Sequence, residues 1–151
     1  MIPFFQVLLD LFREQHATVE RVIAELPPEA LDWNPGKEMN SVTVLVVHMT
    51  GAERFLVGDM LMERHLGRDR AAEFRASGWG AQALIERLHE NDKFLGEAFE
   101  SLRLEELETP RTHPASGKTL SAGWAVLHAL EHTAEHCGHI ELVRQMWQQR
   151  T

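Results

Sequence analysis

The sequence predicts an all-α fold, a four-helix bundle with long connections between its helices. Apolar residues recur at helical spacing in four stretches, at about residues 3–26, 41–65, 81–102 and 121–147. The segments between these stretches hold many turn residues and show no convincing strand pattern. Four amphipathic helices without a sheet form a bundle, and 151 residues suit one core, so we expect a single domain over residues 1–151.

The first two helices have clear boundary signals. Pro27 and Pro28 end the first helix, and Ser41 is a suitable N-cap for the second, which we expect to end near His65. Residues 42–47 are rich in β-branched side chains, as strands are, but no turn signal separates them from the helical spacing that follows. We therefore predict one helix, and its nearly continuous apolar character is typical of a buried one.

Two long connections lie in the second half of the chain. Residues 66–79 are rich in arginine and alanine and predict a connection with room for a short helical piece. The third helix is expected over residues 81–102, and residues 103–119 are expected to form an irregular loop before the fourth helix. We expect the two connections to cap one end of the bundle and to shape a pocket there.

The composition argues against several classes of partner. The net charge is −8 and the pI is near 5.6, which argues against a nucleic-acid-binding face. No apolar run reaches membrane-spanning length, and the N-terminus lacks the basic residues and cleavage site of a signal peptide. The single cysteine, Cys137, suits a reducing cytoplasm, where we expect the protein to reside.

The fourth helix carries a row of histidines. Four of the nine histidines in the chain lie in it, and at about 100° per residue they share one stripe: His128, His132, His136 and His139. Ala125 and Val143 fall on the same stripe, so the imidazoles point where apolar side chains point. An apolar core has no use for so many polar rings unless something binds them.

The spacing of His132 and His136 suits a metal ion. Side chains at positions i and i+4 lie about 5–6 Å apart on one helix face, within reach of one ion. The natural third ligand is His48, the other histidine in a mostly apolar helical segment. Three neutral nitrogens leave a fourth position open to water or substrate, and they suit zinc, nickel, copper or ferrous iron rather than calcium or magnesium. The alternative is a set of hydrogen-bonded core histidines that bind nothing.

The order of these features resembles the DinB/YfiT superfamily of four-helix-bundle metalloproteins. The matching stretches are Trp33-Asn34-Pro35, residues 41–53 and residues 124–140. Many members of the family carry His-Arg-Gly-Gln-Ile where this chain has His136-Cys137-Gly138-His139-Ile140. The resemblance covers nearly the whole chain in order and is most specific in the last helix.

The resemblance implies that His48, His132 and His136 bind a divalent metal and that homodimers form. Characterised branches of the family include S-transferases that use bacillithiol, mycothiol or glutathione, a mycothiol-dependent maleylpyruvate isomerase, and metal-dependent hydrolases. We therefore expect a metal-dependent transferase or hydrolase that acts on a small molecule, with a low-molecular-weight thiol as cosubstrate in the transferase case. The alternatives are a non-catalytic stress protein that binds a metal or small ligand, and a dimeric bundle whose histidines are structural.

Several residues near the histidine stripe have candidate roles. Glu53 is the candidate for a general base or for a carboxylate behind a metal ligand, with a surface ion pair as the alternative. His128 is expected to line a pocket or to pack, and His139 is expected to support a ligand or to form a pocket wall. Cys137 lies about 140° from His132 on the helix, so it faces away from the metal.

Two further features bear on partners. Leu127 and Leu130 lie opposite the histidine stripe, where they face a neighbouring subunit or the end loops. His113 precedes the last helix and lies either at a pocket mouth or on the surface.

Overall fold

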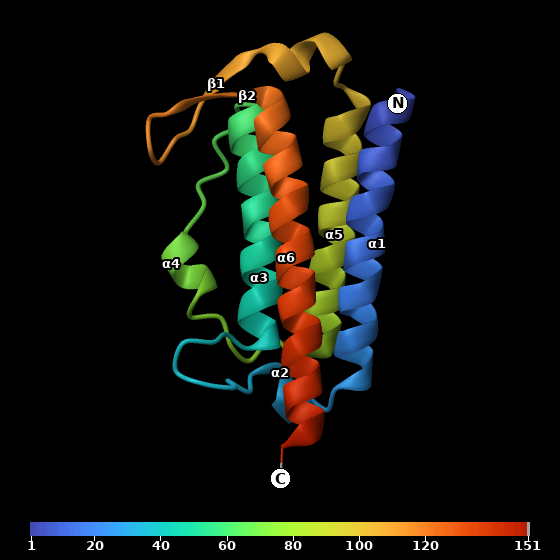
Figure 1. Cartoon of the computed structure of the whole chain (residues 1–151), viewed down its shortest axis with the longest axis vertical. Coiled ribbons are helices and arrows are strands. Elements are labelled where there is room, and N and C mark those ends of the chain that lie inside the picture. Colours follow the sequence, from blue (N-terminus) through green and yellow to red (C-terminus); the bar gives the residue numbers. More distant parts are fainter. Residues whose placement is uncertain (151) are drawn as a thin grey trace.

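The computed structural model describes residues 1–150 and is built from four long helices (Figure 1). They are α1 (Pro3–Glu25), α3 (Val42–Glu53), α5 (Gly80–Glu100) and α6 (Ala122–Gln149). The helix of α3 continues as π-helical turns, η1 (Arg54–Leu61), and ends before His65. The predicted all-α bundle is confirmed, and each long helix lies within a few residues of its predicted span.

The order of the helices in space differs from their order in the chain. α1 packs beside α5 and α6, and α3 packs beside the same two helices. α1 and α6 run in one direction and α3 and α5 in the other (Figure 1). The chain must therefore return along the bundle between α3 and α5, and residues 62–79, with the short helix α4 (Arg70–Glu73), make this return. The expectation that both connections cap one end is wrong for this segment, which lies along the side of α3.

The second connection is more regular than the sequence predicts. It holds a 3₁₀ helix, η2 (Leu104–Glu108), and an antiparallel hairpin of β1 (Pro110–Thr112) and β2 (Thr119–Ser121), in which Pro110 lies opposite Ser121. Strands of three residues are too short to show alternation, so no strand pattern could be recognised in these residues. The short helix α2 (Pro28–Leu31), which follows α1, is likewise too short to show helical spacing in the sequence.

α3 is the central helix, because all twelve of its residues are buried. Burial on every side explains why a β-branched segment forms a helix here, since tertiary packing outweighs a weak local preference. The predicted N-cap is confirmed: the backbone N–H of Val44 donates to Oγ of Ser41 at 3.2 Å.

The interior of the bundle holds two apolar clusters with a polar layer between them. One cluster is built around Phe5, Phe12 and Phe99, and the other around Ile23, Met49 and Ile140. Between the clusters, each long helix contributes at least one buried polar side chain: His16 of α1, Glu53 of α3, Asn91 of α5 and Thr133 of α6. No helix within residues 1–150 is both long and apolar enough to cross a membrane.

Candidate metal centre

Three histidines from two helices converge on one point. The candidate ligand nitrogens of His48 on α3 and of His132 and His136 on α6 all lie within 4.8 Å of one another. Nε2 of His132 lies 3.1 Å from Nε2 of His136, close to the roughly 3.3 Å that separates two nitrogens bound to a tetrahedral zinc ion. No other such group of histidine, cysteine or acidic residues occurs within residues 1–150. The structure thus brings together the three residues that the sequence singles out, and their role as ligands remains a prediction.

The two candidate ligands on α6, His132 and His136, are held in their neutral form. Burial, followed by repulsion from His136 and His48, lowers the pKa of His132 to about 3. Burial and repulsion from His48 likewise lower the pKa of His136 to about 4. A metal binds the deprotonated ring, so neither histidine has to lose a proton at neutral pH before it binds an ion.

Glu73 fixes the orientation of His48. Nδ1–H of His48 donates to Oε2 of Glu73 at 2.9 Å, which leaves Nε2 as the nitrogen with a free lone pair. Arg68 donates from Nε to Oε1 at 2.7 Å and from Nη2 to Oε2 at 2.8 Å. Burial alone would raise the pKa of Glu73, but hydrogen bonds from Arg68 and His48 outweigh it and lower that pKa below its usual value. Glu73 therefore stays ionised and keeps the proton of His48 on Nδ1.

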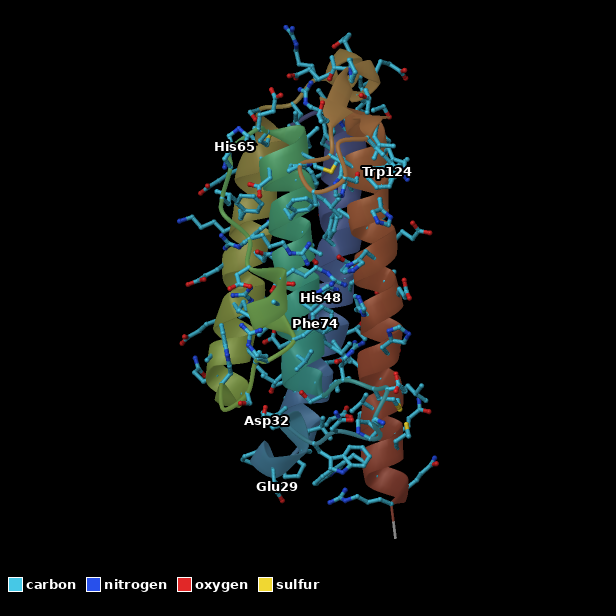
Figure 2. The ribbon with its side chains drawn as sticks, turned by 90° about the vertical axis from the view of Figure 1, so that its left-hand side faces the viewer. Glu29, Asp32, His48, His65, Phe74 and Trp124 are labelled. Carbon is cyan, nitrogen blue, oxygen red and sulfur yellow. The ribbon has the colours of Figure 1, made fainter. Side chains whose placement is uncertain are left out.

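A glycine on α3 makes this contact possible. A Cβ atom at Gly51 would collide with Oε1 of Glu73, so the carboxylate reaches the helix only where a side chain is missing. The ring of Phe74, next in the chain, lies 4.5 Å from the ring of His48 (Figure 2). Glu73 and Phe74 belong to the return connection, and the sequence showed no pattern there that could have singled them out.

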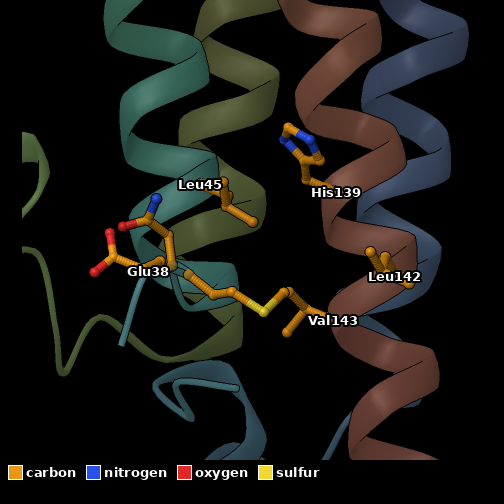
Figure 3. Close-up of a pocket in the computed structure, with 7 residues that line it drawn as sticks. Glu38, Leu45, His139, Leu142 and Val143 are labelled. Carbon is orange, nitrogen blue, oxygen red and sulfur yellow. The ribbon is translucent and has the colours of Figure 1, made fainter. Parts of the chain in front are cut away.

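His139 supports His136 from the other side. Nδ1 of His139 lies 3.3 Å from Nδ1 of His136, and His139 also lines a cavity of about 130 Å³ between α6 and the start of α3. Figure 3 shows His139 and Val143 on α6 across from Leu45 of α3. His139 therefore forms a pocket wall, as expected, and it contacts His136, whose role as a metal ligand remains a prediction. Nδ1 of His132 is buried and has no hydrogen-bond partner within residues 1–150.

A second cavity of about 130 Å³ opens over the histidines. Its floor includes His48 and His132, and its remaining lining is Ala52, Phe55, Leu56, Arg68, Arg70, His113 and His128. Within residues 1–150, no carboxylate lines it. His113 thus lies at the pocket and not merely on the surface, and His128 both lines the pocket and stacks on the ring of Trp124 at 4.5 Å.

Comparison with known proteins identifies the family. A model of the DinB superfamily matches residues 11–140. The chain belongs to the DinB superfamily. No curated protein sequence matches this DinB-superfamily chain.

Solved structures share the fold at low sequence identity. A conserved protein from Enterococcus faecalis superposes with a TM-score of 0.79 at 14% identity, covering 97% of this chain and 98% of that one. A DinB-like protein from Bacillus subtilis gives 0.72 at 14% identity, with 95% and 92% covered. YfiT from Bacillus subtilis, described as a probable metal-dependent hydrolase with an unusual four-helix bundle topology, gives 0.77 at 13% identity, with 99% and 91% covered. These likenesses establish the fold of the DinB chain.

Glu53 lies in the polar layer of the bundle. It is fully buried, so the alternative of a surface ion pair is wrong. Its Oε1 accepts a hydrogen bond from Thr133 at 2.7 Å and lies 3.0 Å from Nε2 of His16, while the Asn91 amide donates to Oε2. Glu53 does not line the cavity over the histidines, and its role as a general base remains a prediction.

His16 lies between two carboxylates. Its Nδ1 lies 2.7 Å from Oδ1 of Asp92, and its Nε2 faces Glu53. Burial lowers its pKa, but the charge of Glu53 and the hydrogen bonds to Asp92 and Glu53 outweigh burial and raise the pKa to about 10. The ring is therefore a buried cation at neutral pH. The sequence did not single out His16, because an isolated histidine on an amphipathic helix carries no signal of its partners.

Among the other residues of α6, Cys137 faces away from the histidines as predicted, whereas Leu130 packs against the apolar core of the bundle. Cys137 is buried, with Sγ 3.8 Å from the carbonyl oxygen of Gln15, and burial raises its thiol pKa to about 11. It therefore faces α1 and is a packing residue. Leu130 is partly buried against the apolar core, whereas Leu127 is 58% exposed.

Proposed function

We propose that this DinB-superfamily chain binds a divalent transition metal through His48, His132 and His136 and uses it to activate a small thiol for transfer to an electrophile. The observation that carries the proposal is the convergence of three imidazoles, two of which, His48 and His132, line a cavity that within residues 1–150 no carboxylate lines. Zinc, nickel and iron all suit three nitrogen ligands.

The residues around the histidines suit such an ion. A bound divalent ion supplies Lewis-acid chemistry, which lowers the pKa of a thiol or water that coordinates it. Glu73 holds His48, and His139 meets His136, so both rings present Nε2 toward the shared point. Phe55 and Leu56 form an apolar wall that limits the access of water to the nucleophile.

Two further histidines at the cavity differ in their free ring nitrogen, which is a proton donor in His113 and a proton acceptor in His128. The backbone N–H groups of Ala115 and Ser116 both donate to Nδ1 of His113, so its proton lies on Nε2, which is a donor. Nδ1 of His128 lies 3.1 Å from Oε2 of Glu131, so Nδ1 carries the proton and Nε2 can accept one. His128 is therefore the residue that takes the thiol proton. The sulfur then bonds to carbon of the electrophile, and the leaving group departs with its electron pair.

The lack of a carboxylate in the cavity favours a thiol over water. A thiol has an ordinary pKa of about 8.5, whereas the pKa of water is about 15.7, so water needs more help from a base. Hydrolytic metal sites commonly supply that help with a glutamate. Hydrolysis is the second candidate, because YfiT, which shares this fold, is described as a probable metal-dependent hydrolase.

We also propose that the chain forms a homodimer through the N-terminal halves of α1 and α6, two helices that pack side by side. Val7 and Leu127 are each 58% exposed, and Phe4 and Leu11 are also exposed on α1. Apolar side chains gathered on neighbouring helices suit an interface with a second copy. Measurement of the molar mass in solution, for the natural chain and for Leu127→Asp, tests this arrangement: a monomeric natural chain contradicts it.

The test of the function combines metal analysis with turnover. Protein purified without a histidine tag should hold about one divalent ion per chain, and His132→Ala should lose it while circular dichroism shows the fold retained. The control His128→Ala should keep the ion and lose turnover. Assays with bacillithiol, mycothiol and glutathione, each with an alkylating electrophile, should reveal the thiol, and a panel of esters tests hydrolysis. Bound metal with no turnover in either assay would leave the non-catalytic binding protein as the function.

A further inference from the structure

The cavity lined by His48 and His132 differs in charge from the rest of the molecule. The chain carries a net charge of −8, yet the charged and titratable side chains that line this cavity are two arginines and four histidines. Two carboxylates within residues 1–150 contact residues of the lining, and both have partners: Glu73 is bound by Arg68 and His48, and Glu131 lies 3.1 Å from Nδ1 of His128. A cationic pocket in an acidic protein concentrates anions at that one place.

Arg70 is the charge in this cavity that has no anionic partner. Arg68 uses Nε and Nη2 to hold Glu73, so its charge is neutralised by that carboxylate. The guanidinium of Arg70 makes no hydrogen bond or ion pair within residues 1–150 and lies 4.8 Å from the centre of the Phe74 ring. Because Phe74 also contacts His48, the stacked arginine is held at the edge of the histidine site. Its planar fork is therefore free to bind a carboxylate with two hydrogen bonds.

His113 adds a neutral donor at the same cavity. Its ring lies 5.3 Å from the ring of Phe55, and the two backbone N–H groups on Nδ1 leave Nε2–H as its donor. The hairpin that carries His113 and the return connection that carries Arg70 both contribute to the wall. The two donors thus come from the connections between the long helices and not from the helices themselves.

We propose that the substrate or cosubstrate of this site carries a carboxylate, which binds the guanidinium of Arg70 and the Nε2–H of His113. This inference rests on the proposed function, because it names the class of molecule that the histidine site acts on. A carboxylate is favoured over a phosphate because a single unpaired arginine with one neutral donor matches two oxygens and one negative charge.

The test uses succinate as the probe and its neutral analogue succinamide as the matched control. Both are titrated calorimetrically into zinc-loaded protein and into metal-free protein. Succinate should bind at least roughly tenfold more tightly than succinamide, and Arg70→Gln should weaken succinate by a similar factor. His113→Phe, which keeps a ring beside Phe55, should weaken it by a few-fold. Arg75→Gln removes an exposed arginine that does not line the cavity and should leave succinate binding unchanged.

The outcomes separate this inference from the proposed function. Equal binding of succinate and succinamide, an Arg70→Gln variant with unchanged affinity, or tighter binding of inorganic phosphate than of succinate overturns the carboxylate assignment. The zinc content of the same samples is measured independently. Full zinc occupancy without carboxylate preference leaves the metal site standing and removes the inference. Arg70-dependent succinate binding by a protein that takes up no zinc supports the carboxylate pocket and contradicts the metal site.

Discussion

The bundle of this DinB-superfamily chain contains two polar clusters, and they differ in how completely their groups are satisfied. His48 and Glu53 both come from α3, and His132 and Thr133 are neighbours on α6. Glu53 and His16 are closed from solvent and bonded on every side. Of the three histidines, His48 and His132 line an open cavity, and Nδ1 of His132 has no partner within residues 1–150. The same two helices thus hold one cluster whose polar groups are all hydrogen-bonded, which stabilises the fold, and one cluster with an unpaired polar group, which suits a ligand.

The pH dependence of stability is the largest difference expected between the clusters. The folded-state pKa of His16, about 10, lies above its ordinary value of 6.5. Its contribution is therefore fully present below pH 6.5 and is lost as the pH rises toward 10, an effect on the order of several kcal/mol. Urea unfolding of the natural chain and of His16→Gln measures this. The stability difference between them should shrink steadily over that range, and a constant difference would show that His16 is not a buried cation.

The second expected effect is the cost of breaking the buried pair. Glu53→Gln removes the charge that faces His16 and leaves only Asp92 to balance it. We expect a loss of about 3 kcal/mol in the free energy of unfolding, measured by urea denaturation. Glu131→Gln breaks an exposed pair with His128 and should cost less than about 1 kcal/mol. If Glu53→Gln unfolds like the natural chain but loses turnover, Glu53 is a general base and the division into two clusters fails.

Glu73 should affect metal binding without being a ligand. Glu73→Gln removes the anion that fixes Nδ1–H of His48, and we expect the affinity for zinc to fall roughly tenfold to a hundredfold. Gly51→Ala should act in the same direction, because its Cβ pushes the carboxylate away while leaving it in the chain. Competition with a coloured chelator measures both. Glu53→Gln serves as the control from the other cluster, and an equal loss of affinity in that variant would show that the clusters are not independent.

The sequence was most informative where local pattern and tertiary environment agree. The row of histidines on α6 and the apolar segment around His48 gave the bundle and the convergent site, because helical spacing fixes which side chains share a face. Glu73 and Arg68 could not be found this way. They reach His48 through a connection that runs the length of the bundle, and the contact depends on the missing side chain at Gly51.

Glu53 is the opposite case: the sequence singled it out, but its environment could not be predicted. Its position after His48 suggested chemistry, but its environment is set by His16 on α1 and Asn91 on α5, which lie far from it in the chain. Spacing along one helix cannot report partners on two others. The charge of a buried carboxylate can therefore be interpreted only once the packing of the four helices is known.

The smallest expected effect concerns His139, which supports the histidine site from its exposed side. The 3.3 Å separation between Nδ1 of His139 and Nδ1 of His136 is long for a hydrogen bond, so the support is weak. We expect His139→Leu to lower the affinity for zinc by tenfold at most, toward the low end for partners of metal ligands. His139→Gln, whose side-chain oxygen can accept from Nδ1–H of His136, should retain the affinity of the natural chain. If the leucine and glutamine variants bind zinc equally well, His139 acts only as a wall of the cavity between α6 and the start of α3. The hydrogen bond to His136 then contributes nothing to the site.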